Sequence, residues 1–175
     1  MIVTAMRRDS DDYTPTMPAV GLRRHADFAV QEVTISGYTR DKAQRQAEIY
    51  DMVKEAISTA SRSGVQLAYG ERTVEPLTLT NYRSLSLEAD RRPDSERITF
   101  LIKAPLADGA DARAAQSRIT SFIKAVKPVG RAQMDATGDL TLSIVAPDQY
   151  RGAIADIVAA DAKPMAAKLG DTYAV

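Results

Sequence analysis

Apolar and polar residues recur with two different periods along this chain, and these periods predict its strands and helices. Three stretches alternate at every second position, as half-buried strands do: about 27–38, 97–103 and 140–145. Three others repeat their apolar residues every three or four positions, as helices do: about 39–63, 111–127 and 147–169. Strands and helices are therefore expected to follow one another along the chain.

The stretch between the first helix and the strand at 97–103 is less regular. Alternation over about 65–79 predicts a strand that is interrupted near Gly70 or Pro76. An edge strand is predicted after it from three apolar residues: Tyr82, Leu85 and Leu87. A short strand at about 130–135 is also expected, before the strand at 140–145.

Four residues set the expected ends of these elements. Thr39 is the predicted N-cap of the first helix, and Gly64 is predicted to end it. Gly138 is expected to make a turn between two short strands. Pro164 is expected to kink or end the last helix, because proline lacks an N–H and crowds the preceding turn.

The order strand, helix, strand, strand, helix, strand, helix predicts an α+β fold. Helices between strands imply crossover connections, which favours a split βαβ-type two-layer sandwich with an extra C-terminal helix. The helices would cover one face of a mainly antiparallel sheet. We expect this domain to span residues 26–175 and to follow a flexible N-terminal tail at residues 1–25, where Pro15 and Pro18 interrupt any regular element.

Composition removes several functional classes from consideration. The chain has no cysteine and a single histidine, His25, so thiolate chemistry and sulfur-based metal sites are excluded. Lys+Arg and Asp+Glu both number 23, which gives no basic excess for nucleic acid. No glycine-rich phosphate loop occurs, and no apolar run approaches the length of a membrane span. We expect no metal, no cofactor, no transmembrane segment and no enzymatic activity.

Two alternatives to this expectation remain. A small ligand could bind in a pocket between sheet and helices, with Tyr69 and Tyr82 as candidate lining residues. A hydrolase could use carboxylates of the acidic middle segment, which requires an Asp or Glu with a raised pKa inside a cleft. His25 beside two arginines is typical of a solvated residue at the junction of tail and domain.

Two surfaces are candidates for contact with other molecules. The β-prone segment Ile2-Val3-Thr4 could add a strand to the edge of a partner's sheet. The last helix is rich in small residues that permit close packing against another element: Ala159, Ala160, Ala166 and Ala167. The formal net charge of +0 also lacks the self-repulsion that keeps proteins apart, which favours association.

Three stretches resemble the SIMPL-domain family of bacterial periplasmic and outer-membrane-associated proteins. They are the strand Val33-Thr34-Ile35-Ser36-Gly37 with its long helix, the strand Arg97–Lys103 with its helix, and the alanine-rich end Ala159–Gly170. The resemblance covers residues 27–170 in order. It implies a non-enzymatic envelope protein that acts through self-association or partner binding, with a link to envelope or oxidative stress. It also implies a periplasmic location and a trimmed signal peptide; a cytoplasmic location is the alternative.

Overall fold

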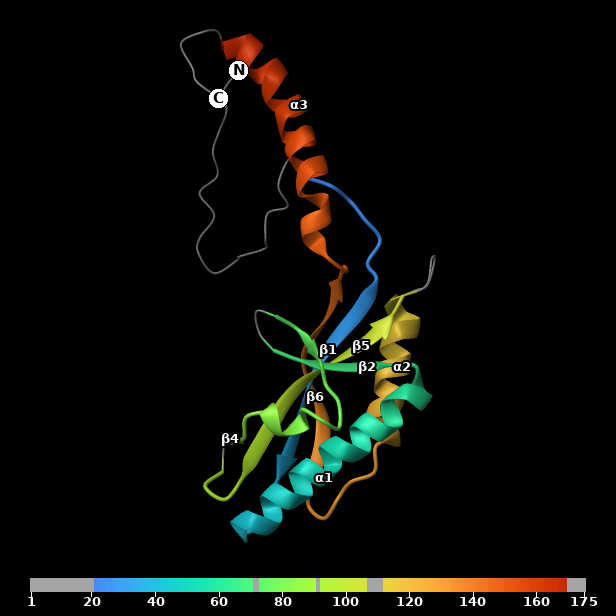
Figure 1. Ribbon diagram of the computed structural model, residues 1–175, viewed down its shortest axis with the longest axis vertical. Coiled ribbons are helices and arrows are strands. Elements are labelled where there is room, and N and C mark those ends of the chain that lie inside the picture. The colour runs from blue at the N-terminus through green and yellow to red at the C-terminus, as the bar shows by residue number, and fades with distance from the viewer. Residues whose placement is uncertain (1–20, 71–72, 91, 107–111, 170–175) are drawn as a thin grey trace, which may run out of the picture. The chain divides into compact units, whose positions relative to one another are not determined.

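The computed structural model describes residues 21–70, 73–90, 92–106 and 112–169. Two compact units are present (Figure 1): His25–Val145 form one, and the described residues 21–24 and 146–169 belong to the other. The expected boundary near residue 26 lies close to this division. The last helix, which we had placed in the same domain, falls in the other unit.

Within the described residues, six strands form one antiparallel sheet in the larger unit, in the order β3-β2-β5-β1-β6, with β4 beside β5. The strands are β1 (Phe28–Gly37), β2 (Gln66–Tyr69), β3 (Glu75–Pro76), β4 (Glu88–Ala89), β5 (Glu96–Pro105) and β6 (Gln133–Ser143). Because β5 is antiparallel to both β1 and β2, strands β1 and β2 run parallel to each other. The same logic makes β6 parallel to β5 across β1.

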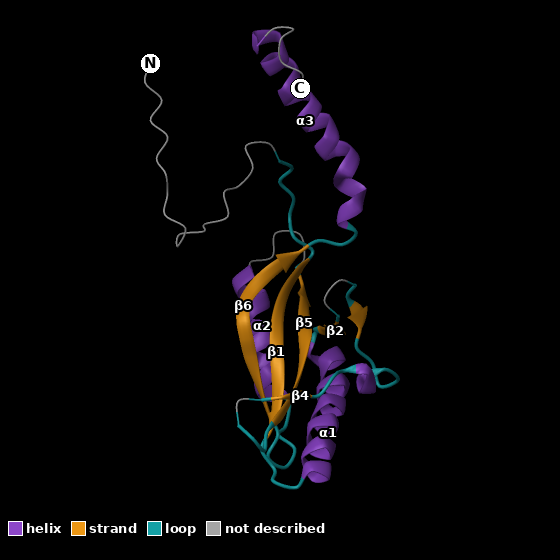
Figure 2. Cartoon of the chain, turned by 90° about the vertical axis from the view of Figure 1, so that its left-hand side faces the viewer, coloured by secondary structure: helices purple, strands orange, loops and turns teal. Residues whose placement is uncertain are grey.

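The helices in these connections complete the predicted fold. They are α1 (Lys42–Ala60), between β1 and β2, and α2 (Ala112–Ala125), between β5 and β6. Each helix joins two parallel strands that have another strand between them, which is the split βαβ arrangement. Both helices cover the same face of the sheet (Figure 2). The α+β prediction is confirmed.

A single apolar layer between that face and the two helices forms the core. Ile35 on β1 and Ile98 and Phe100 on β5 are fully or almost fully buried, as alternation of side chains along a strand requires. They meet Met52 of α1 and Phe122 of α2. The apolar stripe of α1 and the alternation of β5 therefore have the burial that the sequence predicts.

One long strand, β6, replaces the two short strands predicted around Gly138. Gly138 has φ +68°, a left-handed conformation, and the register against β1 shifts between Val30 and Glu32. The strand therefore bulges here instead of turning back. The buried side chain of Gln31 stabilises the bulge, because its Nε2 donates to the carbonyl oxygens of Thr137 at 2.8 Å and Gly138 at 3.1 Å.

Two further predictions are wrong: the N-cap of the first helix and the edge strand around Leu85. Asp41, not Thr39, caps α1: its carboxylate accepts a hydrogen bond from the backbone N–H of Gln44 at 2.8 Å. The segment around Leu85 is not an edge strand. It contains a short 3₁₀ helix, η2 (Tyr82–Ser84), which is followed by the buried Leu85, and the two residues of β4 then pair with β5. Gly64 follows a 3₁₀ turn, η1 (Ser61–Ser63), in the predicted left-handed conformation.

The smaller unit contains η3 (Pro147–Tyr150) and α3 (Arg151–Leu169). The prediction that the helix ends at Pro164 is wrong, because α3 continues through this residue to Leu169. Pro164 is exposed, so water can satisfy the carbonyl group that loses its N–H partner. Three large apolar side chains on α3 are exposed: Ile154, Val158 and Met165.

Candidate anion-binding cleft

Three connecting segments meet at one end of the sheet. The register pairs Gly37 at the end of β1 with Glu96 at the start of β5, and Ser36 with Gln133 at the start of β6. The β1–α1 loop, the β4–β5 turn and the α2–β6 loop therefore emerge side by side. Side chains far apart in sequence are brought together here.

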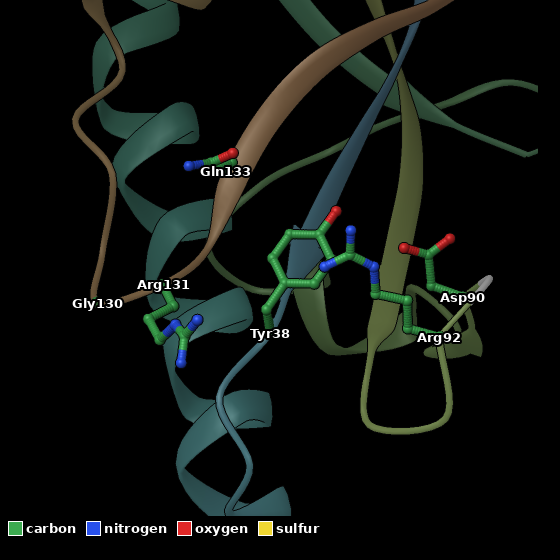
Figure 3. A pocket seen from close by; sticks show the side chains of 6 residues that line it. All are labelled: Tyr38, Asp90, Arg92, Gly130, Arg131 and Gln133. Carbon is green, nitrogen blue, oxygen red and sulfur yellow. The ribbon is translucent and has the colours of Figure 1, made fainter.

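These segments enclose the cleft shown in Figure 3, which has a volume of about 610 Å³. Its lining residues come from all three segments: Tyr38, Asp90, Arg92, Gly130, Arg131 and Gln133. An adjoining recess of about 370 Å³ shares Tyr38, Arg92 and Arg131 with the cleft and adds Arg40, Pro93, Asp94 and Ser95. We call the two together the sheet-end cleft.

Three arginines dominate its charge. The guanidinium of Arg92 lies 5.8 Å from the centre of the Tyr38 ring, within the range of a cation–π contact. Arg131 lies on the other side of Tyr38 in Figure 3, and Arg40 follows Tyr38 by two residues. Within the part of the chain that the structure describes, none of the three forms an ion pair. Arginine also keeps its charge at any ordinary pH.

A buried carboxylate on α1 connects two of the loops that line the sheet-end cleft. Glu48 is only 9% exposed, and its oxygens accept three hydrogen bonds. Thr39 Oγ1 donates at 2.5 Å, the backbone N–H of Arg131 at 3.1 Å and Gln44 Nε2 at 3.0 Å. Gly130 leaves space for this carboxylate, because a β-carbon there would overlap it. Glu48 thus ties the β1–α1 loop to the α2–β6 loop.

One helical turn earlier, Arg45 links the β1–α1 loop to the start of β5. Its Nη1 donates to the carbonyl oxygen of Thr39 at 2.8 Å, and its Nε pairs with the Glu96 carboxylate at 2.8 Å. Gln46 donates to the other oxygen of Glu96, also at 2.8 Å. Both charged groups of the pair are largely buried, so each depends on the other to offset its lost hydration.

Both carboxyl groups of this framework have lowered pKa values. For Glu48, the hydrogen bond from Thr39 lowers the pKa by more than burial raises it, and Arg131 adds to the lowering. For Glu96, burial raises the pKa. The hydrogen bonds from Gln46 and Arg45 and the charge of Arg45 together lower it by more than burial raises it. Both side chains therefore favour the charged form, as anchors of the loops should.

The third segment is fixed by Ser95, which is 3% exposed. Its hydroxyl donates to the carbonyl oxygen of Arg92 at 2.8 Å and accepts from the Arg92 N–H at 3.2 Å. Its carbonyl oxygen accepts from the N–H of Asp90 at 3.0 Å. Asp90 lies 3.9 Å from Arg97 of β5. The backbone that carries Arg92 therefore has a defined conformation.

The two tyrosines predicted to line a pocket are not among the residues of the sheet-end cleft. Tyr69 lines a separate cleft of about 450 Å³ beside β5, and its hydroxyl donates to Glu75 at 3.0 Å. Ser84 and Leu85 line the same cleft. Tyr82 packs edge-on against Tyr50 with 5.8 Å between ring centres. Their role as lining residues of a ligand pocket stays a prediction.

The other candidate residues have the following places. Ala159, Ala160, Ala166 and Ala167 lie on α3, with Ala166 half-buried and the other three exposed. His25 is exposed at the start of the larger unit. Ile2, Val3 and Thr4 lie outside the described residues. Residues 21–70, 73–90, 92–106 and 112–169 contain no group of three or more acidic, histidine or cysteine side chains arranged to hold a metal ion.

Arg45 and Glu48 were not predicted from the sequence, although a signal for them exists. They precede Ile49 and Met52 of the apolar stripe by four residues each, so they continue the buried face of α1 toward its start. Charged residues on a buried helical face imply partners, because an unpaired buried charge is costly. The cleft arginines carry no such periodic signal, since they lie in loops.

No family model matches the chain, and no curated protein sequence is significantly similar to it. The resemblance to the SIMPL-domain family therefore stays a hypothesis. In the described portion of the chain, no helix is both long and apolar enough to span a bilayer.

Proposed function

We propose that this protein is a non-enzymatic binding protein whose sheet-end cleft holds an anionic group of its ligand or partner. The observation that carries the proposal is the convergence of Arg40, Arg92 and Arg131 around Tyr38, since none of the three forms an ion pair in the described structure. Guanidinium groups bind carboxylate and phosphate oxygens through paired hydrogen bonds, so an anion is the complementary ligand.

The framework beneath the cleft supports this assignment. Glu48 and Arg45 place charge in a buried position, where each must be compensated by several hydrogen bonds. Their partners are the backbone and side chains of the loops that carry the cleft arginines. Loops fixed in this way bind with a smaller loss of conformational freedom.

Binding is favoured over catalysis by the chemistry of the lining. Arginine remains protonated throughout the ordinary pH range, so it holds an anion without exchanging a proton with it. The hydrolase alternative requires a carboxyl group with a raised pKa in a cleft. Glu48 and Glu96, whose pKa values are lowered, do not meet this requirement, and neither lines the sheet-end cleft.

The proposal predicts that inorganic phosphate raises the unfolding temperature of the full chain above that in chloride at equal ionic strength. A ligand that binds only the folded state stabilises it by mass action. In the Arg92→Gln/Arg131→Gln double variant, we expect this difference to disappear. Arg62→Gln is the matched control, because Arg62 is an exposed arginine on η1 away from the cleft. A phosphate effect that persists in the double variant would contradict the proposal.

A second candidate function is self-association through α3, as the SIMPL resemblance implies. Ile154, Val158 and Met165 are 41%, 50% and 53% exposed, and they follow one another at helical spacing. The formal net charge of +0 adds no repulsion between copies. A second copy of this chain is the occupant we propose for this face of α3, in a periplasmic protein of the bacterial envelope.

Light scattering on a size-exclusion column tests this second candidate. We expect a discrete oligomer for the full chain and a monomer for Ile154→Glu/Val158→Glu, because charge on the apolar face opposes its burial. Lys163→Glu, on the opposite side of α3, should leave the oligomer intact. A chain starting at Ala26 tests whether Ile2-Val3-Thr4 links the copies instead. A monomeric full chain would rule out self-association.

A further inference from the structure

We infer that the ligand of the sheet-end cleft is an acidic saccharide. One sugar carboxylate binds Arg92 and Arg131, and neutral hydroxyl groups occupy the larger part and the adjoining recess on either side. This inference rests on the proposed anion-binding function and names the class of ligand. It follows from the size of the cleft, the polarity of its lining and the placement of its two carboxylates.

The size of the cleft calls for more than a simple ion. Tyr38, Arg92 and Arg131 line both the cleft of about 610 Å³ and the recess of about 370 Å³, so they stand at the junction of the two. Because a water molecule takes about 30 Å³ in the liquid, the larger part alone has room for roughly twenty of them. An anion held at the junction therefore has space on both sides for the rest of a larger ligand.

The lining suits a remainder that combines polar groups with ring faces. Most side chains that line the two parts carry polar groups, and the Tyr38 ring, the Pro93 ring and the arginine stems supply the apolar surface. Ligands with large apolar groups bind in sites lined mainly by hydrophobic residues. Here the lining offers Gln133 and Asp90 in the larger part and Asp94 in the smaller. Such groups exchange hydrogen bonds with hydroxyls.

Charge limits the ligand to a single acidic group near the junction. Asp90 lines one part and Asp94 the other, on either side of the shared arginines. A second negative charge on the ligand would lie near one of these carboxylates, and like charges repel. A hydroxyl at the same place donates a hydrogen bond to it instead. A carboxylate, with one charge, suits this pattern better than a phosphate monoester with about −1.5 to −2.

The test is calorimetric titration of the full chain with sugars that carry different numbers of carboxylates. Cellobiouronic acid carries one carboxylate, cellobiose none and trigalacturonic acid three; inorganic phosphate serves as the simple anion. We expect cellobiouronic acid to bind at least tenfold more tightly than cellobiose, as a charge-assisted contact implies, and more tightly than phosphate or trigalacturonic acid. Arg92→Gln/Arg131→Gln should weaken it at least tenfold, whereas Arg62→Gln should not.

Asp94→Asn separates the role of the outer carboxylates from that of the arginines. It should weaken cellobiouronic acid several-fold and strengthen trigalacturonic acid, because the repulsion of the extra charges is removed. Unfolding temperatures equal to that of the unaltered chain would show that each variant folds.

The outcomes distinguish this inference from the proposed function. If phosphate binds with dependence on Arg92 and Arg131 and cellobiouronic acid binds no more tightly, the saccharide is wrong while the anion site stands. Tighter binding of trigalacturonic acid than of cellobiouronic acid would overturn the inference that the saccharide carries a single carboxylate. If no probe depends on these two arginines, both the inference and the proposed function fail.

Discussion

Gly130→Ala is expected to lower the free energy of unfolding by about 2–5 kcal/mol. Gly130 has φ +56°, a left-handed conformation that costs other residues about 1–2 kcal/mol. The added β-carbon would also overlap the Glu48 carboxylate. Forcing that carboxylate away breaks the hydrogen bonds from Thr39 and the Arg131 N–H, which adds a packing and polar cost of about 1–3 kcal/mol. Urea denaturation measures the loss.

Gly138→Ala is the matched control for this prediction. Gly138 has a similar φ of +68°, but a β-carbon there would meet no atom within 4 Å. Only the conformational cost remains, so we expect a loss of about 1 kcal/mol. Equal losses in the two variants would mean that the Glu48 carboxylate does not occupy the space beside Gly130.

Glu48→Gln is expected to destabilise the protein by about 2–3 kcal/mol at neutral pH. The carboxylate accepts three hydrogen bonds in a site that is 9% exposed, and an amide can accept on only one of its two groups. The Thr39 hydroxyl and the Arg131 N–H share Oε2, whereas Gln44 donates to Oε1. With the amide carbonyl in the Oε2 position, Gln44 loses its acceptor, and all three donors lose a charged partner. The free energy of unfolding from urea titrations, compared between variant and unaltered chain, gives the difference.

The difference in the free energy of unfolding between the unaltered chain and Glu48→Gln should decrease as the pH falls. Folding lowers the pKa of Glu48 below its ordinary value of 4.5, so its contribution to stability is complete above that value. The contribution is lost as the pH falls through the folded-state pKa, where the carboxylate becomes protonated. We therefore expect the gap between the unaltered chain and Glu48→Gln to narrow below about pH 4.5. A gap that stays constant down to pH 2 would contradict a charged Glu48.

The fold class could be predicted because its main signals are local and periodic. The apolar stripe from Ile49 to Ala60 marks α1, and the alternation of Ile98, Phe100 and Ile102 marks β5. Failures occurred where a long-range contact overrides a local preference. Gly138 suits a turn equally well, but Gln31 on the neighbouring strand stabilises a bulge there. Thr39 suits an N-cap, but its hydroxyl donates to Glu48 instead.

The candidate site was not predictable for a related physical reason. Tyr38, Arg92 and Arg131 lie in three loops that are separated by long stretches of sequence, and loops carry no hydrophobic period. They meet only because the split βαβ topology places the end of β1 and the starts of β5 and β6 at the same end of the sheet. The alternation over about 65–79 located the strand that carries Tyr69, but it contained no information on which strand ends converge.

The central claim is that Arg92 and Arg131 bind an anion in the sheet-end cleft. Two-dimensional NMR of the arginine Nε–Hε groups, during titration of the full chain with inorganic phosphate, tests it most directly. We predict that the signals of Arg92 and Arg131 shift together and reach a plateau described by one dissociation constant, while Arg62 stays in place. Equal, unsaturating shifts of all exposed arginines would contradict the claim, because they would indicate only a general effect of ionic strength.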